Sequence, residues 1–310
     1  MKKTSLKAKS QNLEARSFHK PVLLNEVIDC LCIQKGDIVL DATINGGGHS
    51  SAIADRFGKS IQIIGLDADA GALLRAKQNI SGNPILLNYN FRRLDEALAE
   101  VKTPKVNRII FDLGLSSDQL EQSGRGFSFQ KDEPLLMTFD KDGVGNGFNA
   151  GDIVNKWEAE NIATIIKSYG EERYAKRIAD AIVLNRAMKP ITTSKQLAEI
   201  IKYAVPVKDR YRRVHPATKT FQALRIAVND ELEALKEGLA KAHEHLERNG
   251  RLAVISFHSL EDRIVKHFMR EKVNARQAIA ISKKPITASS KEVTDNPRSR
   301  SAKLRIIEKL

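Results

Sequence analysis

The sequence has few cysteines, few aromatic side chains and no long apolar run. Of its 310 residues, two are cysteines (Cys30 and Cys32) and 5% are aromatic. No apolar run reaches the roughly 20 residues that cross a bilayer, and the polar N-terminus lacks the apolar core of a secretory signal. Two cysteines two residues apart on a helix face different sides, so we expect buried thiols rather than a disulfide or a metal site. These absences favour a cytoplasmic protein and argue against a membrane partner.

Positive charge is what the sequence has in excess. Its 51 Lys and Arg residues against 38 Asp and Glu residues give a formal net charge of +13. The positive residues cluster in the first twenty positions, at Lys208–Arg213 and at Arg298–Arg305. Such clusters indicate a polyanionic partner, and the lack of a strongly amphipathic basic helix favours nucleic acid over a membrane.

Short apolar segments alternate with helical patterns in the first third of the chain. Buried strands are expected at residues 38–42, 61–67, 85–89 and 108–113. Strands separated by helices of this length indicate βαβ units and a parallel sheet. Two later segments, 252–257 and 304–309, read as further strands of the same sheet.

Between these two groups of strands the pattern is helical. Residues 124–149, rich in Gly, Phe and charge, read as a loop, and helices are expected at 158–169, 173–187 and 194–204. One long helical pattern then runs from Pro216 to about residue 248, and residues 272–300 read as a polar, basic loop. The predicted fold class is therefore α/β, a Rossmann-like sheet with a helical insertion over residues 120–216.

The strongest local signal is a glycine-rich turn that follows the first strand. It reads Asp41-Ala-Thr-Ile-Asn45-Gly46-Gly47-Gly48-His49, and it leads into a helix. Glycine lets a ligand approach the backbone closely. The second strand ends about 20 residues later at Asp67, which could accept hydrogen bonds from both hydroxyls of a ribose. Together they predict a site for a nucleoside cofactor, whereas a glycine run alone could be a tight turn.

The residues around this turn suit S-adenosylmethionine better than a dinucleotide. In the pattern G-x-G-x-x-G, Ser51 stands where the third glycine belongs. Asp41 places an acid just before the turn, and acids attract a positively charged sulfonium more than a pyrophosphate. A nicotinamide dehydrogenase is therefore the remote alternative.

The fourth strand ends in Asp112-Leu-Gly-Leu-Ser-Ser117. In open α/β sheets ligands bind outside the carboxyl ends of the strands, so Asp112 is expected beside both cofactor and acceptor. It could bind the methionine ammonium, or orient an exocyclic amine and take its proton, and it is the candidate catalytic residue. The alternative is that Asp112 only caps the following turn.

Several long motifs, in order along the chain, resemble the MraW (RsmH) methyltransferase family from His19 to the C-terminus. The motifs are His19-Lys-Pro-Val-Leu-Leu, Gly47-Gly-His-Ser, Asp112-Leu-Gly-Leu-Ser-Ser, Gly124-Arg-Gly-Phe-Ser-Phe129, Tyr169-Gly-Glu-Glu-Arg-Tyr-Ala-Lys-Arg-Ile178, His215-Pro-Ala-Thr-Lys-Thr-Phe-Gln-Ala-Leu-Arg225, Ser256-Phe-His-Ser-Leu-Glu-Asp-Arg263 and Asn296-Pro-Arg-Ser-Arg-Ser301. The resemblance implies methylation of N4 of a cytosine in the decoding region of 16S rRNA, with S-adenosylmethionine as cofactor. The cofactor contacts that it implies are Gly47, Gly48, His49, Asp67, Phe91, Asp112 and Gln119.

The resemblance also implies a division of the chain. A basic tail (residues 1–18) precedes a discontinuous methyltransferase domain (19–119 and 217–310), which is interrupted by a helical substrate-recognition domain (120–216). The partner is 16S rRNA in the small ribosomal subunit. The sequence does not decide between free rRNA and an assembled subunit, or between a monomer and a homodimer.

Two departures from the family pattern stand out. Asn45 replaces a usual glycine, and asparagine is the next most tolerant residue for positive φ. Leu136 and Thr138 replace the acid and the arginine of the usual P-L-D-M-R-M-D, which could be a compensated change or a sign of altered substrate or weakened activity.

Candidate RNA contacts lie in and after the insertion. Arg125 with Phe127 and Phe129 could contact phosphate and stack on a base, or merely anchor a loop. The run from Lys208 to Arg213 interleaves Tyr211 with basic residues, so Arg212, Arg213 and His215 are further candidates. His215 and His258 could contact the substrate, or they could have purely structural roles. The spacing of His, Cys and Asp predicts no metal site.

Two other functions remain open at this stage. A DNA amino-methyltransferase usually carries [DNS]-P-P-[YFW] after the fourth strand, and Asp112-Leu-Gly-Leu lacks its prolines. A catalytically weak ribosome-binding assembly factor is supported only by Leu136 and Thr138.

Overall fold

The computed structural model describes residues 21–116, 119–120, 123–139 and 147–310, so the predicted basic tail lies outside the described residues. Seven strands form one sheet in the order β3-β2-β1-β4-β5-β7-β6. The strands are β1 (Ile38–Asp41), β2 (Gln62–Leu66), β3 (Ile85–Leu87), β4 (Val106–Asp112), β5 (Leu246–Ser256), β6 (Ala278–Ala280) and β7 (Lys303–Lys309). β1 to β5 pair in parallel, whereas β7 and β6 are antiparallel.

Helices cover both faces of the sheet, and the strand residues alternate between them. Ile110 faces the apolar cluster of α1, α2 and α3, whereas its neighbours Ile109 and Phe111 face that of α4, α12 and α13. These helices are α1 (Leu24–Leu31), α2 (Gly48–Phe57), α3 (Ala70–Asn79), α4 (Leu94–Glu100), α12 (Glu231–His245) and α13 (Ser259–Asn274). The predicted Rossmann-like α/β fold is confirmed.

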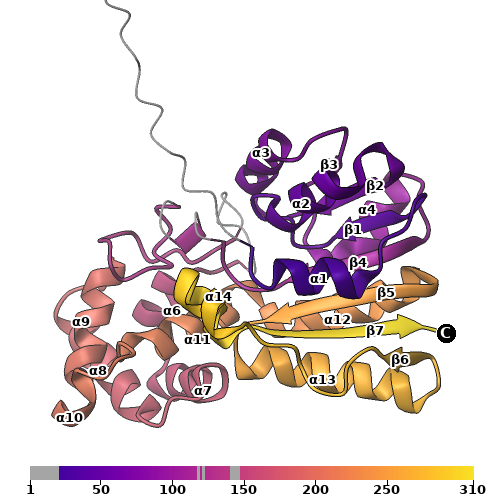
Figure 1. The fold of residues 1–310 in the computed structure, drawn as a ribbon. Coiled ribbons are helices and arrows are strands. Elements are labelled where there is room, and N and C mark those ends of the chain that lie inside the picture. The colour runs from indigo at the N-terminus through magenta and orange to yellow at the C-terminus, as the bar shows by residue number, and fades with distance from the viewer. Residues whose placement is uncertain (1–20, 117–118, 121–122, 140–146) are drawn as a thin grey trace, which may run out of the picture.

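A second unit, built of helices, follows β4 and leads to β5, and it stands beside the sheet in Figure 1. Its helices are α6 (Ala150–Lys156), α7 (Ala159–Gly170), α8 (Ala175–Met188), α9 (Ser194–Ala204), α10 (Val207–Arg210) and α11 (Ala217–Asn229). Ile153, Ile166, Ile178 and Leu197 share one buried cluster with Phe221 of α11. The proposed domain boundary at residue 216 stays a prediction, but the helix after it contributes to the core of the helical unit.

The helical pattern predicted from Pro216 to residue 248 is two helices, not one. α11 ends where Asp230 adopts a left-handed conformation (φ 49°), and α12 starts at the next residue. Aspartate tolerates this conformation better than most non-glycine residues, and the Arg92 guanidinium lies 2.5 Å from its carboxylate. No Gly or Pro marks the break between α11 and α12, so the helical pattern of apolar residues continues through it and predicts one helix.

Residues 272–300 are not the simple loop expected from their polarity. They contain the edge strand β6, the helix α14 (Ser290–Asp295) and the 3₁₀ turn Pro297–Ser301. α14 is capped by the Ser289 side chain, and its Glu292 carboxylate accepts a hydrogen bond from the Leu23 N–H at 2.8 Å. These contacts tie the segment to the start of α1.

The expectation for residues 124–149 agrees with the structure, because their described part contains no helix and α6 begins only at Ala150, capped by Asn149 and Asp152. The expectation of two buried thiols, by contrast, is wrong. Cys32 is exposed, because α1 ends at Leu31 and Cys32 turns out in a left-handed conformation (φ 48°), while Cys30 is half-buried. Among the described helices, none has the length and apolarity to cross a membrane.

Candidate active site

Three acids end neighbouring parallel strands and lie at one edge of the sheet. Asp41 ends β1, Asp112 ends β4 and Asp67 directly follows β2. All three side chains are buried or nearly so. Buried carboxylates are costly without compensating positive charge, so this edge favours a cationic ligand.

The glycine-rich turn connects the first of these acids to α2. Asn45, which stands where the family usually has glycine, adopts a positive φ of 51°, and Gly47 has φ 82°. A Cβ on Gly47 would lie 2.9 Å from the Ile80 side chain and 3.2 Å from Cα of Ala76. Gly47 therefore lets the start of α2 pack closely on α3, and the turn leaves open space next to Asp67.

Asp67 is held by the backbone of that turn and of the next one. Its Oδ2 accepts a hydrogen bond from the Asn45 N–H at 2.9 Å, and its Oδ1 accepts one from the Asp69 N–H at 2.8 Å. Burial raises the pKa of Asp67 to about 7, although these two hydrogen bonds act against the rise. A ribose hydroxyl or a cation bound next to Asp67 would therefore favour the ionised form of its carboxyl.

A small cavity of about 60 Å³ lies over Asp67, and three of the predicted cofactor residues line it. Asp67, Phe91 and Gln119 line it, together with Phe139 and Glu231. The Phe91 ring packs edge-on against Phe111 at 5.5 Å. Gly47, Gly48 and His49 do not line this cavity; they shape the turn at its rim.

Asp112 lines a second, larger cavity. Its N–H donates to Thr43 Oγ1 at 2.6 Å, and its Oδ2 lies 3.4 Å from His49 Nδ1. Its Oδ1 is buried and accepts no hydrogen bond from the described residues. An unpaired buried acceptor costs roughly 1–3 kcal/mol, so a hydrogen-bond donor on a ligand would offset that cost.

The larger cavity, of about 510 Å³, lies between the sheet and the helical unit. Asp112 and Phe257 line it from the sheet, whereas Phe129 and Phe221 line it from the helical unit. Asn45 and Gly114 line both cavities, so the two adjoin at these residues.

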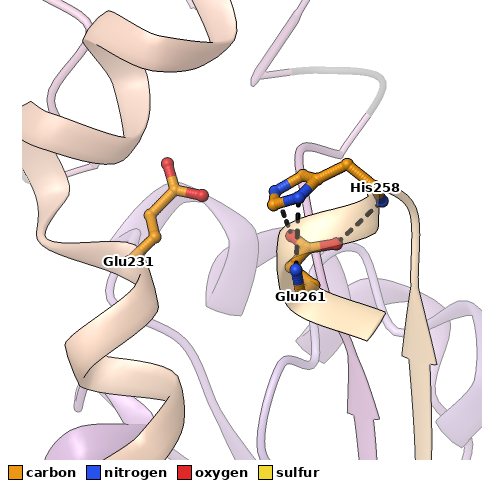
Figure 2. Close-up of side chains that lie close together, drawn as sticks. All are labelled: Glu231, His258 and Glu261. Atoms are coloured by element: carbon orange, nitrogen blue, oxygen red, sulfur yellow. Dashed lines mark hydrogen bonds and ion pairs between the residues drawn. The ribbon is translucent and has the colours of Figure 1, made fainter. Parts of the chain in front are cut away.

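A polar group that the sequence did not reveal lies where the two cavities meet. Figure 2 shows Glu231, at the start of α12, turned toward His258 and Glu261 at the start of α13. Ligand atoms of the three residues lie within 4.8 Å of one another, which is a spacing compatible with a metal ion. Both Glu231 oxygens, however, accept hydrogen bonds from Arg225 at 2.7 and 2.8 Å, and His258 Nε2 lies 3.0 Å from Glu261. Arg225 thus already balances the Glu231 carboxylate, and the His258 ring lies against the carboxylate of Glu261.

Charge governs protonation in this group. Burial raises the pKa of Glu231 despite Arg225. Burial acts in the same direction on Glu261, but His258 and Arg225 outweigh it and lower the pKa of Glu261. In the sequence, this group is indicated only by the spacing of His258 and Glu261, which form a capping box on α13.

Two of the predicted RNA contacts are buried. The Arg125 guanidinium lies 2.8 Å from Asp69 Oδ2 and donates to the carbonyls of Thr138 and Phe139. Phe127 belongs to the core of the helical unit and stacks on Phe139 at 5.8 Å. These contacts correspond to the loop-anchoring alternative rather than to phosphate binding and base stacking.

The other predicted RNA residues are accessible. Phe129 stacks on His215 with ring centroids 4.6 Å apart and lines the larger cavity. His215 also borders a third hollow of about 630 Å³ with Arg212 and Arg213. Arg212 pairs with Asp209 at 2.6 Å, and both Arg213 and Tyr211 are exposed.

The order of the parallel strands, the glycine-rich turn and the acids at the strand ends define a Rossmann-like domain that can bind a nucleoside cofactor. The model of the MraW methylase family matches residues 16–310, and the chain belongs to that family. It is 44% identical to the ribosomal RNA small subunit methyltransferase H of Persephonella marina, over 94% of this chain and 99% of that one. The protein of the same name from Syntrophotalea carbinolica is also 44% identical, over 94% and 98%.

A solved structure, TrmN from Thermus thermophilus, aligns with 93% of this chain and 48% of its own, at 11% identity and a TM-score of 0.44. The family assignment confirms the resemblance seen in the sequence. S-adenosylmethionine is the cofactor, as the acids around the turn predicted.

Cofactor affinity should depend on pH through Asp67. Because the pKa of Asp67 is raised to about 7, the fold loses stability as the pH rises toward 7 and this carboxyl is forced to ionise. Ribose hydroxyls and a nearby positive charge favour the ionised form, so we expect the Kd for S-adenosylmethionine to rise up to about tenfold per pH unit below 7.

Calorimetric titration between pH 5.5 and 8.5 measures this dependence. Asp67→Asn should bind weakly with a flat profile, whereas Asp55→Asn, a surface control on α2, should keep the wild-type profile. A wild-type Kd that does not change with pH would show that Asp67 does not ionise on binding.

Proposed function

We propose that the protein methylates N4 of a specific cytosine in the decoding region of 16S rRNA. The observation that carries the proposal is the buried Asp112 Oδ1, which accepts no hydrogen bond from the described residues and belongs to the lining of the larger cavity. An exocyclic amine in the larger cavity would donate a hydrogen bond to this oxygen. The names of the curated relatives support the rRNA substrate, and the family resemblance supports the nucleotide.

The residues of the chain divide the work of the reaction. Asp67, Phe91 and Gln119 would hold S-adenosylmethionine, which when bound would supply an electrophilic methyl group and keep both electrons of the broken S–C bond as a neutral thioether. Asp112 would orient the N4 amine and accept the proton that leaves nitrogen as the new N–C bond forms. Alignment of the two reactants therefore dominates the mechanism.

The larger cavity fits a base turned out of its strand. A target amine inside a helix is inaccessible, so the base must be single-stranded or flipped. Phe129, already stacked on His215, offers an aromatic wall, while Arg225 and His258 offer polar atoms for the edge of the base. One chain forms both cavities, so the chemistry requires no homodimer.

The helical insertion, residues 120–216, would act as the substrate-recognition domain in this proposal. Arg213 and Tyr211 lie exposed beside the basic hollow. A substrate of this size favours the assembled small subunit over free rRNA, because several separate contacts can hold it at once. Ribosome assembly would place the reaction in the cytoplasm.

Loss of one phosphate contact should weaken RNA binding uniformly. We expect Arg213→Gln to lower the magnitude of the slope of log K against log salt by about 1, because one fewer counterion is released. Lys77→Gln removes the same charge from exposed α3, away from the helical unit, and should leave the slope unchanged. Filter binding of small subunits between 50 and 300 mM salt gives both slopes; equal slopes for Arg213→Gln and wild type would remove Arg213 from the RNA surface.

The proposed reaction is tested by methyl transfer from labelled S-adenosylmethionine to small subunits that lack the modification. Mass spectrometry of the digested rRNA should find one N4-methylcytidine. Methyl groups on another nucleotide or on C5 would overturn the proposed specificity, and transfer to single-stranded DNA at the same rate would favour the DNA enzyme. Equal rates on naked rRNA fragments would exclude the assembled subunit as the preferred acceptor.

Binding of cofactor and subunit without transfer would favour the assembly-factor alternative. Leu136 and Thr138 would then be the residues to change. The Thr138 carbonyl accepts a hydrogen bond from Arg125, so this segment lies against the anchor of the insertion. Recovery of transfer in the double variant Leu136→Asp, Thr138→Arg would assign the lost activity to them.

A further inference from the structure

His49 follows the glycine-rich turn, and its ring is almost completely buried, with 4% of its surface exposed. Each ring nitrogen faces an oxygen. Nε2 lies 3.0 Å from the Val22 carbonyl, and Nδ1 lies 3.4 Å from Asp112 Oδ2. The ring thus bridges the chain before α1 and the end of β4.

The nature of these two oxygens restricts the protonation state. A carbonyl only accepts, so Nε2 must carry a hydrogen. A neutral ring would then turn the Nδ1 lone pair toward the carboxylate, which is repulsive unless a proton lies between them. The contact is attractive when Nδ1 is also protonated, and the ring is then an imidazolium.

The charges around the ring act in the same direction. Asp41 on β1 and Asp112 on β4 are the charged groups of the described residues that act on it, and the segment before α1 contributes the Val22 carbonyl. Burial disfavours the imidazolium, but the two carboxylates outweigh it and raise the pKa of His49 above its ordinary value. Asp41 is itself fixed by a 2.6 Å hydrogen bond from Ser50 Oγ.

We propose that His49 is a positioning residue whose imidazolium binds Asp112 Oδ2 and turns Oδ1 toward the acceptor amine. Only Oδ1 remains for a ligand, because Oδ2 is taken by the ring. The family resemblance implied a cofactor contact at His49, which its backbone can make; the ring has this separate role. The inference rests on the proposed function only for the identity of the amine.

The consequence for catalysis is a loss of alignment. Without the imidazolium the Asp112 carboxylate is free to rotate, so Oδ1 no longer faces the acceptor amine in one fixed orientation. We expect His49→Gln to lower kcat on the order of ten- to a hundredfold, the range for a lost charged hydrogen bond. KM for the cofactor should change little, because the proposed role of the ring involves no contact with the cofactor.

The deciding experiment is NMR of the full-length protein labelled with ¹³C and ¹⁵N in its histidine rings, with His49 assigned by its loss in His49→Gln. We expect both His49 nitrogens to be protonated at pH 7, and the ring to titrate at a lower pH in Asp112→Asn. The internal control is His243, near the C-terminal end of α12, whose ring signals should be the same in Asp112→Asn as in wild type.

A neutral His49 at pH 7, or a titration that Asp112→Asn leaves unchanged, would overturn the inference. No RNA and no methyl transfer enter this measurement. A failure of the proposed reaction therefore leaves the result standing, and a failure here leaves the proposed reaction untouched.

Discussion

Asp112→Asn should reduce methyl transfer to small subunits by about 10²–10⁴-fold, the range for loss of a general base. The change keeps the shape of the side chain and removes its charge. An amide oxygen can still accept a hydrogen bond from the amine but cannot take its proton. The rate of a single turnover at saturating cofactor reports this step without product release.

The control for this variant is Asp29→Asn, which removes the same charge from an exposed site on α1 that pairs with Arg56. It should transfer methyl at the wild-type rate. The Kd for S-adenosylmethionine, measured in the same samples, separates the two roles open to Asp112. Asp112 would be a cofactor ligand and not a base if Asp112→Asn transferred methyl at the wild-type rate once the cofactor is saturating. Its slower transfer at low cofactor concentration would then match its loss of affinity for the cofactor.

The chemistry of the sheet edge was readable from the sequence because its parts are local. Asp41, the glycine-rich turn and Asp67 follow one another within 30 residues, and the carboxyl ends of parallel strands must meet at one edge. The alternation of strands and helices likewise predicted the parallel part of the sheet. Each of these inferences needs only a short window of sequence.

What the sequence did not reveal depends on contacts between distant segments. Arg125 reads as a free basic residue, and only the fold shows that its partner is Asp69, 56 positions earlier. Arg225 and Glu231 meet across α11 and α12, which a continuous apolar pattern had merged into one helix, and His258 comes from the start of α13. The break at Asp230 carries no glycine, so composition could not place it.

The larger cavity was missed for the same reason. It forms where Phe129 and Phe221 of the helical unit face Asp112 and Phe257 of the sheet. The sequence predicted both units, yet their relative placement depends on contacts such as that between Arg125 and Asp69. The anchoring of the insertion is therefore as much a part of the site as the acids.

Arg125→Met should lower the free energy of unfolding by roughly 3–5 kcal/mol, because it leaves the buried Asp69 carboxylate without its partner. Asp69 is 3% and Arg125 8% exposed at the side chain. Burial alone would raise the pKa of Asp69, but Arg125 outweighs it and lowers that pKa. A lowered pKa contributes stability above the ordinary pKa of aspartate and loses it as the pH falls through the folded value, so the loss in Arg125→Met should be largest near pH 7.

Urea unfolding at pH 7 measures this loss. The matched control is Arg93→Met, whose partner Glu96 is exposed and regains water, so this variant should unfold much like wild type. Adding Asp69→Asn to Arg125→Met removes the stranded charge and should recover part of the stability. If Arg125→Met instead unfolds like wild type but binds small subunits more weakly, then Arg125 contacts RNA and the insertion is anchored by its apolar contacts alone.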